Sequence, residues 1–277
     1  MRIPKHPESE YLNLLQACLE EGLPSDDRTG VGTRSLFGRQ MRFDMERGFP
    51  MLTTKKVHWK SMVWEFIWFC KGIVNAQWLQ DRGVTIWDEW ATPEACAKFG
   101  REPGDLGPVY GKQLRRYGST EVDQLQETID RIKANPNSRR HVVSLWHAED
   151  AKQVTLPPCH AFMQFYARSG KLSLQMYQRS ADVFLGVPFN IASYGLMLHM
   201  VAHLTNLKPH ELVITFGDVH LYNNHFEQAR TQLERVPRDF PTLRVSPYLQ
   251  NIDDLRYDDF KLEGYNPHRA IKAPVAI

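Results

Sequence analysis

The sequence predicts an α+β fold, a single domain in which a mixed β-sheet core is covered by one or two buried helices. Two segments, 61–71 and 190–207, are apolar on almost every helical face, which is typical of buried helices. Segments of strand-like composition occur at 36–43, 141–146, 161–167, 171–178 and 212–216. No repeat, low-complexity tract or linker divides the chain, so residues 1–277 are interpreted as one domain.

The first third of the chain is expected to hold two helices and a strand. Three leucines share a face of a predicted helix over residues 11–22, and Gly22 supplies its C-terminal stop. Partial alternation of apolar and polar residues around Gly38 predicts the strand at 36–43. The buried helix at 61–71 follows.

The remaining elements alternate between helix and strand. Apolar residues from 122 to 132 repeat at helical spacing, and Asn135-Pro136 ends that helix. The strands 161–167 and 171–178 flank Arg168-Ser169-Gly170, which predicts a hairpin turn. A further helix at 223–235 precedes a proline-punctuated C-terminal stretch with short strands.

Composition and charge exclude several classes of protein. With 34 basic and 32 acidic residues the net charge is +2, so neither a nucleic-acid coat protein nor an anionic-membrane binder is expected. The N-terminus lacks the apolar segment of a signal peptide, and the longest apolar stretch, 62–70, is too short to span a bilayer. The 4 cysteines show no C-x-x-C spacing. We therefore expect a soluble, cytoplasmic protein.

Glu65 is the first candidate catalytic group. Its helical neighbours Met62, Trp68 and Phe69 are large and apolar, so the carboxylate should lose hydration and its pKa should rise. Such a group, facing a cleft, can transfer protons near neutral pH. The alternative is a glutamate at a cavity edge that pairs with an arginine.

Cys159 is a candidate nucleophile because of its setting. Pro157 and Pro158 precede it, forbid a regular helix and fix the approach of the backbone. A nucleophilic cysteine needs its thiolate form, which nearby cations favour. His160 should point the opposite way on an extended chain, which argues against a papain-like dyad. Simple packing stays the alternative for a lone cysteine.

Several arginines are candidates for binding a phosphate group: Arg28, Arg139, Arg140 and Arg179, the last followed by Ser180. A guanidinium fork suits bidentate phosphate binding, and a serine hydroxyl can add a donor. Each arginine taken alone could equally be a solvated surface residue. Arg179 stands out because it ends a predicted strand.

Charged, amide and aromatic residues crowd together in 178–190, where Gly186 and Pro188 are expected to prevent regular structure. Asn190 can both donate and accept, so it can read a base edge that carries a carbonyl beside an N–H. Its alternative role is that of a helix N-cap.

Two further segments offer groups for a flat, hydroxylated ligand. Trp87 and Trp90 supply aromatic faces, although tryptophan pairs often only fill cores. His220 and Tyr222 could bind a sugar hydroxyl. His220 and His225 lack the spacing of a His-x-x-x-His pair and no carboxylate completes a ligand triad, so no metal is predicted.

Taken in order, these motifs resemble the thymidylate synthase family. The matching segments are 27–30, 85–90, 107–111, 138–140, 156–160, 178–190, 218–222 and 273–277. Only the first two dozen residues and 91–103 fall outside the resemblance. The latter is interpreted as a loop longer than in the shortest bacterial members.

The resemblance implies that the chain methylates dUMP at C5 to dTMP, with 5,10-methylenetetrahydrofolate as carbon donor and reductant, and releases dihydrofolate. Cys159 would add to C6 of the uracil. Glu65 would assist proton transfers through ordered water, and Tyr110 or a water that it orients would remove the C5 proton. Asn190 and Asp182 would complete the catalytic set.

The resemblance also implies the binding residues. Those expected for dUMP are Arg28, Arg139, Arg140, Arg179, Ser180, Asp182, Asn190, His220 and Tyr222. Those expected for the folate are Lys55, His58, Ile86, Trp87, Asp182, Leu185, Gly186, Phe189 and Ala276. In this scheme Asn190 reads O4 and N3 of the uracil, Asp182 accepts from the pterin and Lys55 meets the glutamate tail.

Members of this family are obligate homodimers that associate through their sheets, so Arg139 and Arg140 would reach the phosphate in the partner's site. One alternative is a pyrimidine hydroxymethylase of the same superfamily; its cytosine-directed forms carry Asp at the position of Asn190. Others are a non-catalytic nucleotide- or RNA-binding module and a cysteine hydrolase. Binding of the protein to its own messenger RNA is left open.

Overall fold

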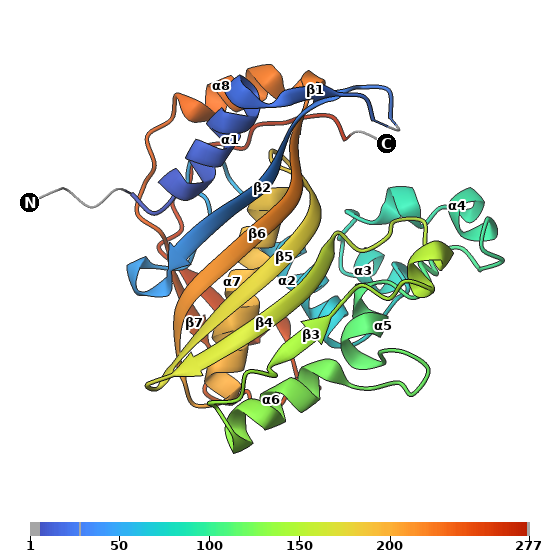
Figure 1. The fold of residues 1–277 in the computed structure, drawn as a ribbon, viewed down its shortest axis with the longest axis vertical. Helices are drawn as coiled ribbons and strands as arrows, with labels where there is room; N and C mark the ends of the chain where they lie inside the picture. Colours follow the sequence, from blue (N-terminus) through green and yellow to red (C-terminus); the bar gives the residue numbers. More distant parts are fainter. Residues whose placement is uncertain (1–5, 28, 276–277) are drawn as a thin grey trace, which may run out of the picture.

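The computed structural model describes residues 6–27 and 29–275. Its centre is a six-stranded sheet in the order β1-β2-β6-β5-β4-β3 (Figure 1). The strands are β1 (Leu23–Ser25), β2 (Thr33–Asp44), β3 (Val142–Ser144), β4 (His160–Arg168), β5 (Lys171–Asp182) and β6 (Lys208–Tyr222). Neighbouring strands pair antiparallel except β5 and β6, which are parallel. The predicted mixed sheet of an α+β fold is confirmed.

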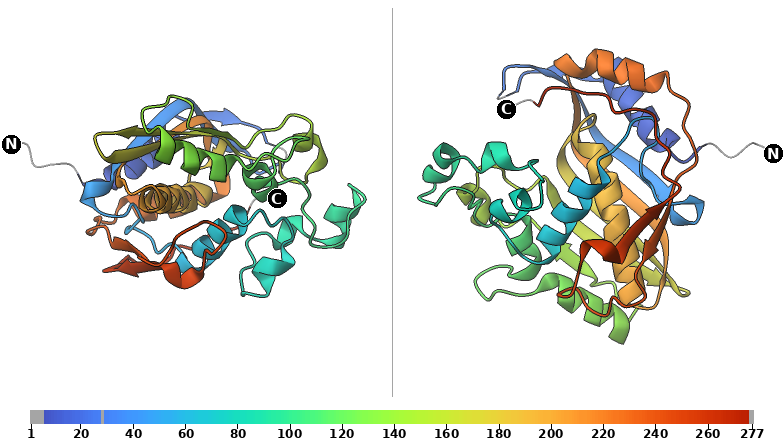
Figure 2. Two further views of the ribbon diagram at one scale, coloured as in Figure 1. Left: turned by 90° about the horizontal axis from the view of Figure 1, so that it is seen from below. Right: turned by 180° about the vertical axis from the view of Figure 1, so that it is seen from behind.

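The helices gather mainly behind and around this sheet. They are α1 (Ser9–Glu21), α2 (Trp59–Cys70), α3 (Gln77–Gln80), α4 (Pro93–Ala97), α5 (Tyr110–Arg115), α6 (Gln124–Ala134), α7 (Gly186–Leu204) and α8 (Phe226–Leu233). Seen from behind, α7 and α2 lie in front of the strands (Figure 2). A two-stranded sheet of β7 (Thr242–Val245) and β8 (Phe260–Glu263) packs in the same layer.

Helix α7 is the crossover that the parallel pair β5–β6 requires. It packs on both strands, and 13 of its 19 residues are buried, as its apolar sequence predicts. It begins at Gly186, earlier than the predicted residue 190, and Pro188 lies in its first turn, where a missing N–H costs nothing. The expectation of irregular structure throughout 178–190 is therefore wrong, because β5 also continues to Asp182.

Other predicted elements are present with shifted bounds. The hairpin between β4 and β5 is confirmed: Ser169 and Gly170 have φ of 50° and 74°, the positive values that a two-residue turn needs. Gly22 does follow α1, but with φ of −59° it is not a left-handed stop. A Cβ at Gly22 would lie 2.4 Å from the Cys18 carbonyl oxygen, which explains the glycine. The segment expected to be a loop at 91–103 contains α4, which Thr92 caps.

The front face of the sheet is not covered by any described helix across β2, β6, β5 and β4 (Figure 1). Phe162 and Tyr177 are register partners there and are 41% and 38% exposed, and Tyr166 on β4 is 55% exposed. Gln40 and Thr215 continue this face across β2 and β6 with a hydrogen bond of 2.9 Å. We call this surface the outer sheet face. Among the described residues, no helix has the length and apolarity to cross a membrane.

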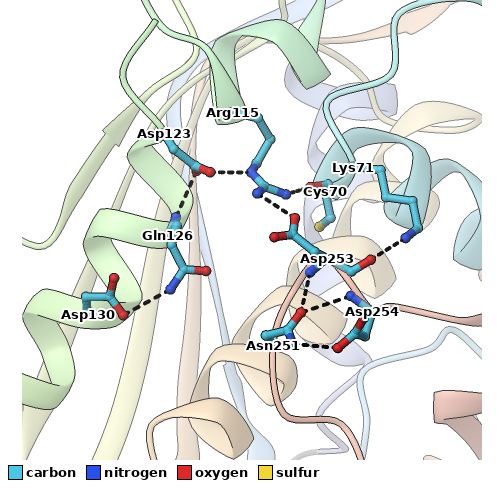
Figure 3. Close-up of polar contacts among 9 residues, drawn as sticks. All are labelled: Cys70, Lys71, Arg115, Asp123, Gln126, Asp130, Asn251, Asp253 and Asp254. Carbon is cyan, nitrogen blue, oxygen red and sulfur yellow. Dashed lines mark hydrogen bonds and ion pairs between the residues drawn. The ribbon is translucent and has the colours of Figure 1, made fainter.

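A network around Arg115 joins three segments next to the end of α2 (Figure 3). Its guanidinium donates to the carbonyl oxygen of Cys70 (2.6 Å), to Asp123 Oδ2 (2.8 Å) and to Asp253 Oδ1 (2.7 Å). Cys70 ends α2, Asp123 caps α6 and Asp253 lies in the loop before β8. The Arg115 side chain is only 11% exposed. If it were removed, little water could reach its partners to replace the lost hydrogen bonds.

Replacing Arg115 by Met should lower the free energy of unfolding by about 3 kcal/mol, because the mostly buried Cys70 carbonyl loses its charged donor. The control Arg39→Met removes the exposed ion pair with Glu21 and should cost less than about 1 kcal/mol. Urea unfolding at one protein concentration measures both. Equal losses would mean that the Arg115 network stabilises no more than a surface pair does.

Candidate active site

Cys159 lies immediately before β4, and neighbouring elements hold it by its backbone. Its N–H donates to the hydroxyl of Tyr110 at 2.7 Å, and its carbonyl accepts the N–H of Arg179 at 2.8 Å. The Arg179 guanidinium donates to the carbonyls of Pro158 (2.8 Å) and Pro157 (2.9 Å). The same Nη2 lies 4.0 Å from Cys159 Sγ. The thiol is half-buried and therefore reachable.

His160 points away from this thiol, as expected for its neighbour on an extended chain. It is buried, and its ring lies 5.1 Å from the rings of both Tyr110 and Tyr194. Burial lowers its pKa to about 4, so the imidazole is neutral near pH 7. A hydrogen bond with the Asn190 side chain opposes this lowering in part, so His160 lies beside Asn190 as well as the two tyrosines.

Glu65 is half-buried on α2, and its Oε1 accepts the indole N–H of Trp87 at 2.7 Å. Burial raises its pKa to about 7, although the Trp87 hydrogen bond lowers it in part. No arginine pairs with it within 6–27 and 29–275, so the alternative of a salt-bridged glutamate is not what the structure contains. The carboxyl group is therefore poised between its two protonation states near neutral pH.

Trp87 has a different position from the one expected of a folate-packing residue. It is only 6% exposed, with Trp68 at 5.4 Å and Trp90 at 5.8 Å between ring centroids. Its indole N–H donates to Glu65 and orients that carboxyl group. Trp90 is half-buried and presents more surface.

Asn190 lies inside α7, not at its N-cap, which is Leu185. Its Oδ1 accepts from Gln178 Nε2 at 3.1 Å. Gln178 is 3% exposed on β5 and was not singled out in the sequence. The alternation along this strand predicts an apolar side chain at position 178, so an amide there is the sequence feature that could have identified Gln178. Gln178 fixes which way the Asn190 amide faces.

The parallel strands β5 and β6 bring Ser180 and Asp182 beside the sugar-binding candidates on β6. The β5–β6 register places Ser180 opposite Asp218 and Asp182 opposite His220. His220 Nδ1 lies 2.7 Å from Asp218 Oδ1, a hydrogen bond that lowers the pKa of Asp218. With Nδ1 occupied, Nε2 is left for a ligand. Tyr222 ends β6, with its ring 5.3 Å from that of His220.

Asp182 supports the turn that leads into α7. Its Oδ1 accepts the N–H groups of Phe184 (2.9 Å) and Leu185 (3.1 Å). Beyond this turn, Leu185, Gly186 and Phe189 are half-buried along the start of α7. Asp182 thus keeps Oδ2 for a ligand beside a partly apolar wall.

The remaining folate candidates, Ile86, His58 and Lys55, differ in their exposure. Ile86 is half-buried before Trp87, and His58 is exposed at the N-cap of α2, with Nδ1 2.8 Å from Ser61 Oγ. The Lys55 ammonium is buried, donates to the Phe184 carbonyl and lies 3.5 Å over the Phe184 ring. Burial lowers its pKa to about 7. A contact of Lys55 with the glutamate tail stays a prediction.

The other predicted arginines are not gathered at Cys159. Arg139 and Arg140 are exposed before β3, and Gln164, midway along β4, donates to the Arg139 carbonyl at 3.4 Å. Neither guanidinium meets a carboxylate in the part of the chain that the structure describes. The predicted residues Arg28 and Ala276 lie outside the described residues. Within 6–27 and 29–275, no three His, Cys, Asp or Glu side chains form a metal-binding group.

Residues of β5 thus hold Cys159, the Asn190 amide and the start of α7, and His220 lies on the neighbouring strand β6. A family model described as thymidylate synthase matches residues 9–277. This family methylates dUMP with methylenetetrahydrofolate. Because the match covers nearly the whole chain, the protein belongs to the thymidylate synthase family.

Proposed function

We propose that the protein converts dUMP and 5,10-methylenetetrahydrofolate into dTMP and dihydrofolate. The observation that carries the proposal is the fixed position of Cys159, whose loop is bound by Arg179 and whose Sγ lies 4.0 Å from that guanidinium. A cation at this distance favours the thiolate, the nucleophilic form. The folate supplies the carbon unit and the hydride when bound.

The Cys159 thiolate adds to C6 of the uracil, and the C5–C6 π electrons move toward C5 and O4, which makes C5 nucleophilic. After the methyl group has formed at C5, the C6–S bond breaks and the thiolate is restored. Arg179, Ser180 and Arg28 bind the 5′-phosphate. Asn190, oriented by Gln178, reads O4 and N3 of the base. These contacts hold the ring so that C6 faces the sulfur, which lowers the entropic cost of addition.

Glu65 and Tyr110 handle the protons, and both contact Trp87. With a pKa of about 7, Glu65 both donates and accepts protons near neutral pH. Burial raises the pKa of Tyr110 well above its usual value, so the phenol stays protonated. A water oriented by Tyr110, not the phenolate itself, is therefore favoured as the base for the C5 proton.

His220 and Tyr222 bind the 3′-hydroxyl. The folate rings lie against Leu185, Gly186 and Phe189, and Asp182 Oδ2 accepts from the pterin. Support for this assignment comes from the half-buried apolar wall at the start of α7 and the free acceptor beside it.

The protein acts as a homodimer through the outer sheet face, with Arg139 and Arg140 donated to the partner's phosphate site. Exposed aromatic residues on this face and two exposed arginines beside β3 support the proposal. The hydrogen bond from Gln164, midway along β4, to the Arg139 carbonyl supports a role outside the chain's own site.

A single assay separates the alternatives. Mixing the protein with dUMP and methylenetetrahydrofolate should release dihydrofolate, which is followed by absorbance. A hydroxymethylase would instead release tetrahydrofolate, and a non-catalytic binding module would release neither. Either result would contradict the proposed function.

Replacing Cys159 by Ala should abolish turnover and leave dUMP binding, because the phosphate and base contacts lie on other residues. Wild-type protein incubated with 5-fluoro-dUMP and the folate should carry a covalent adduct on Cys159 in peptide mass spectrometry. The control Cys96→Ala alters a buried thiol on α4 and should keep activity. An adduct on Cys18, Cys70 or Cys96 would disprove the assignment.

Replacing Glu65 by Gln should reduce kcat by about 10²–10⁴-fold with little change in dUMP affinity. Between the ordinary value of 4.5 and the folded value of about 7, the native state holds a proton that the unfolded state has lost. The wild-type free energy of unfolding should therefore fall as pH rises through this window, by about 3 kcal/mol relative to Glu65→Gln. Urea unfolding at pH 4.5 and pH 8 tests this. If the difference in free energy of unfolding between wild type and Glu65→Gln does not change with pH, the pKa of Glu65 is not raised.

Shared sites can be tested by mixing two defective proteins. Cys159→Ala and the double variant Arg139→Ala/Arg140→Ala should each be nearly inactive alone. Refolded together, about half of the dimers are mixed, and each mixed dimer holds one intact site, so about a quarter of wild-type activity should return. Inactivity despite confirmed heterodimers would show that the arginines act within their own subunit.

A further inference from the structure

The segment after β8 lies along the body of the protein as a strap, residues 264–275 (Figures 1 and 2). It runs beside α8 and is fastened to the segment before α2. The Tyr265 hydroxyl donates to the Leu52 carbonyl at 2.8 Å, and the His268 N–H donates to the Thr53 carbonyl at 2.7 Å. These contacts fix the first half of the strap.

The second half is held by His225, which is fully buried between β6 and α8. Its Nε2 lies 2.7 Å from the carbonyl oxygen of Pro274. A carbonyl only accepts, so Nε2 carries the proton. His225 Nδ1 is buried and has no hydrogen-bond partner in the described part of the chain. Within 6–27 and 29–275, the strap contact is thus the only hydrogen bond of this imidazole.

The His225 ring also contacts two parts of the proposed site. Its centroid lies 5.5 Å from that of Phe184 and 5.7 Å from that of Tyr222. Phe184 belongs to the turn that Asp182 holds, and its carbonyl accepts from Lys55. Tyr222 is the proposed partner of the sugar hydroxyl. One side chain therefore contacts the strap, the turn that leads to the proposed folate-binding residues and the proposed sugar-binding Tyr222.

We propose that His225 is a positioning residue that fixes the strap against the folate side of the site. The inference rests on the proposed function, in which the folate lies against Leu185, the residue after Phe184. The hydrogen bond to Pro274 holds the second half of the strap on His225, and the His225 ring packs against Phe184 in the turn that leads to Leu185. Without it, folate binding must first order this segment, and affinity for the folate falls.

The experiment compares two substitutions of His225 whose side-chain amides differ in length. In His225→Gln the side-chain NH₂ extends to the place of Nε2 and can donate to Pro274, whereas in His225→Asn it is too short. Both variants lose the ring contacts equally, so their difference isolates the hydrogen bond. His225→Phe keeps the ring without a donor and serves as a second donorless variant should the Asn variant not fold.

Trypsin reports on the strap without any ligand. Cleavage after Lys272, which is exposed, requires the strap to detach and enter the protease. We expect cleavage in the Asn and Phe variants to be about tenfold faster than in wild type and in the Gln variant. Equal rates across these proteins would overturn the anchoring role of His225.

Steady-state kinetics report on the site. The Asn and Phe variants should raise the KM for methylenetetrahydrofolate about tenfold, with the KM for dUMP changed less than about twofold in His225→Phe. The control His268→Asn removes a bond of 2.9 Å from the same strap to the Val236 carbonyl, far along the chain from Pro274. It should leave both KM values unchanged.

The outcomes separate the inference from the function on which it rests. Faster cleavage with an unchanged folate KM would overturn the positioning role and leave only a structural anchor. Absence of dihydrofolate release by the wild type would overturn the proposed function, while the trypsin comparison would still decide whether His225 holds the strap.

Discussion

The position of Cys159 depends above all on the guanidinium of Arg179. Pro157 and Pro158 have no N–H to donate, so hydrogen bonds can hold these two residues only through their carbonyls, and Arg179 donates to both. The Cys159 N–H adds one bond, to the Tyr110 hydroxyl. Arg179 lies on β5, which is paired on both sides in the middle of the sheet. Cys159 thereby acquires the rigidity of the sheet instead of the mobility of a loop. The same charge lies beside the sulfur, so scaffold and electrostatic support come from one side chain.

Much of the fold was predictable because the largest elements show their burial in the sequence. The helices α2 and α7 are apolar on nearly all faces, and the β4–β5 hairpin has its turn signal at Ser169-Gly170. The short helices α3, α4 and α5 escaped notice, because tertiary packing, not periodicity, stabilises one or two turns. The start of α7 was misjudged because Pro188 was interpreted as a breaker, although a proline in the first turn is compatible with a helix.

The site was predictable where a residue contrasts with its immediate neighbours. Glu65 among aromatic residues and Cys159 after two prolines are such cases. Contacts between residues far apart in the sequence cannot be recognised from the neighbours of either residue. The burial of Lys55 depends on Phe184, 129 residues away, and the orientation of Glu65 depends on Trp87, 22 residues away. A lysine and a tryptophan in isolation give no reason to expect either arrangement.

The pairing of β2 with β6 has a consequence for synthesis of the chain. Thr33 lies opposite Tyr222, so the centre of the sheet joins a strand made early in translation to one made late. The nascent β2 has no partner on that edge until β6 has left the ribosome, and its backbone groups stay open to other chains meanwhile. Contacts between such distant segments form slowly. The time between the synthesis of β2 and that of β6 should therefore determine how much the nascent chain needs chaperones. The stability of the finished protein should matter less.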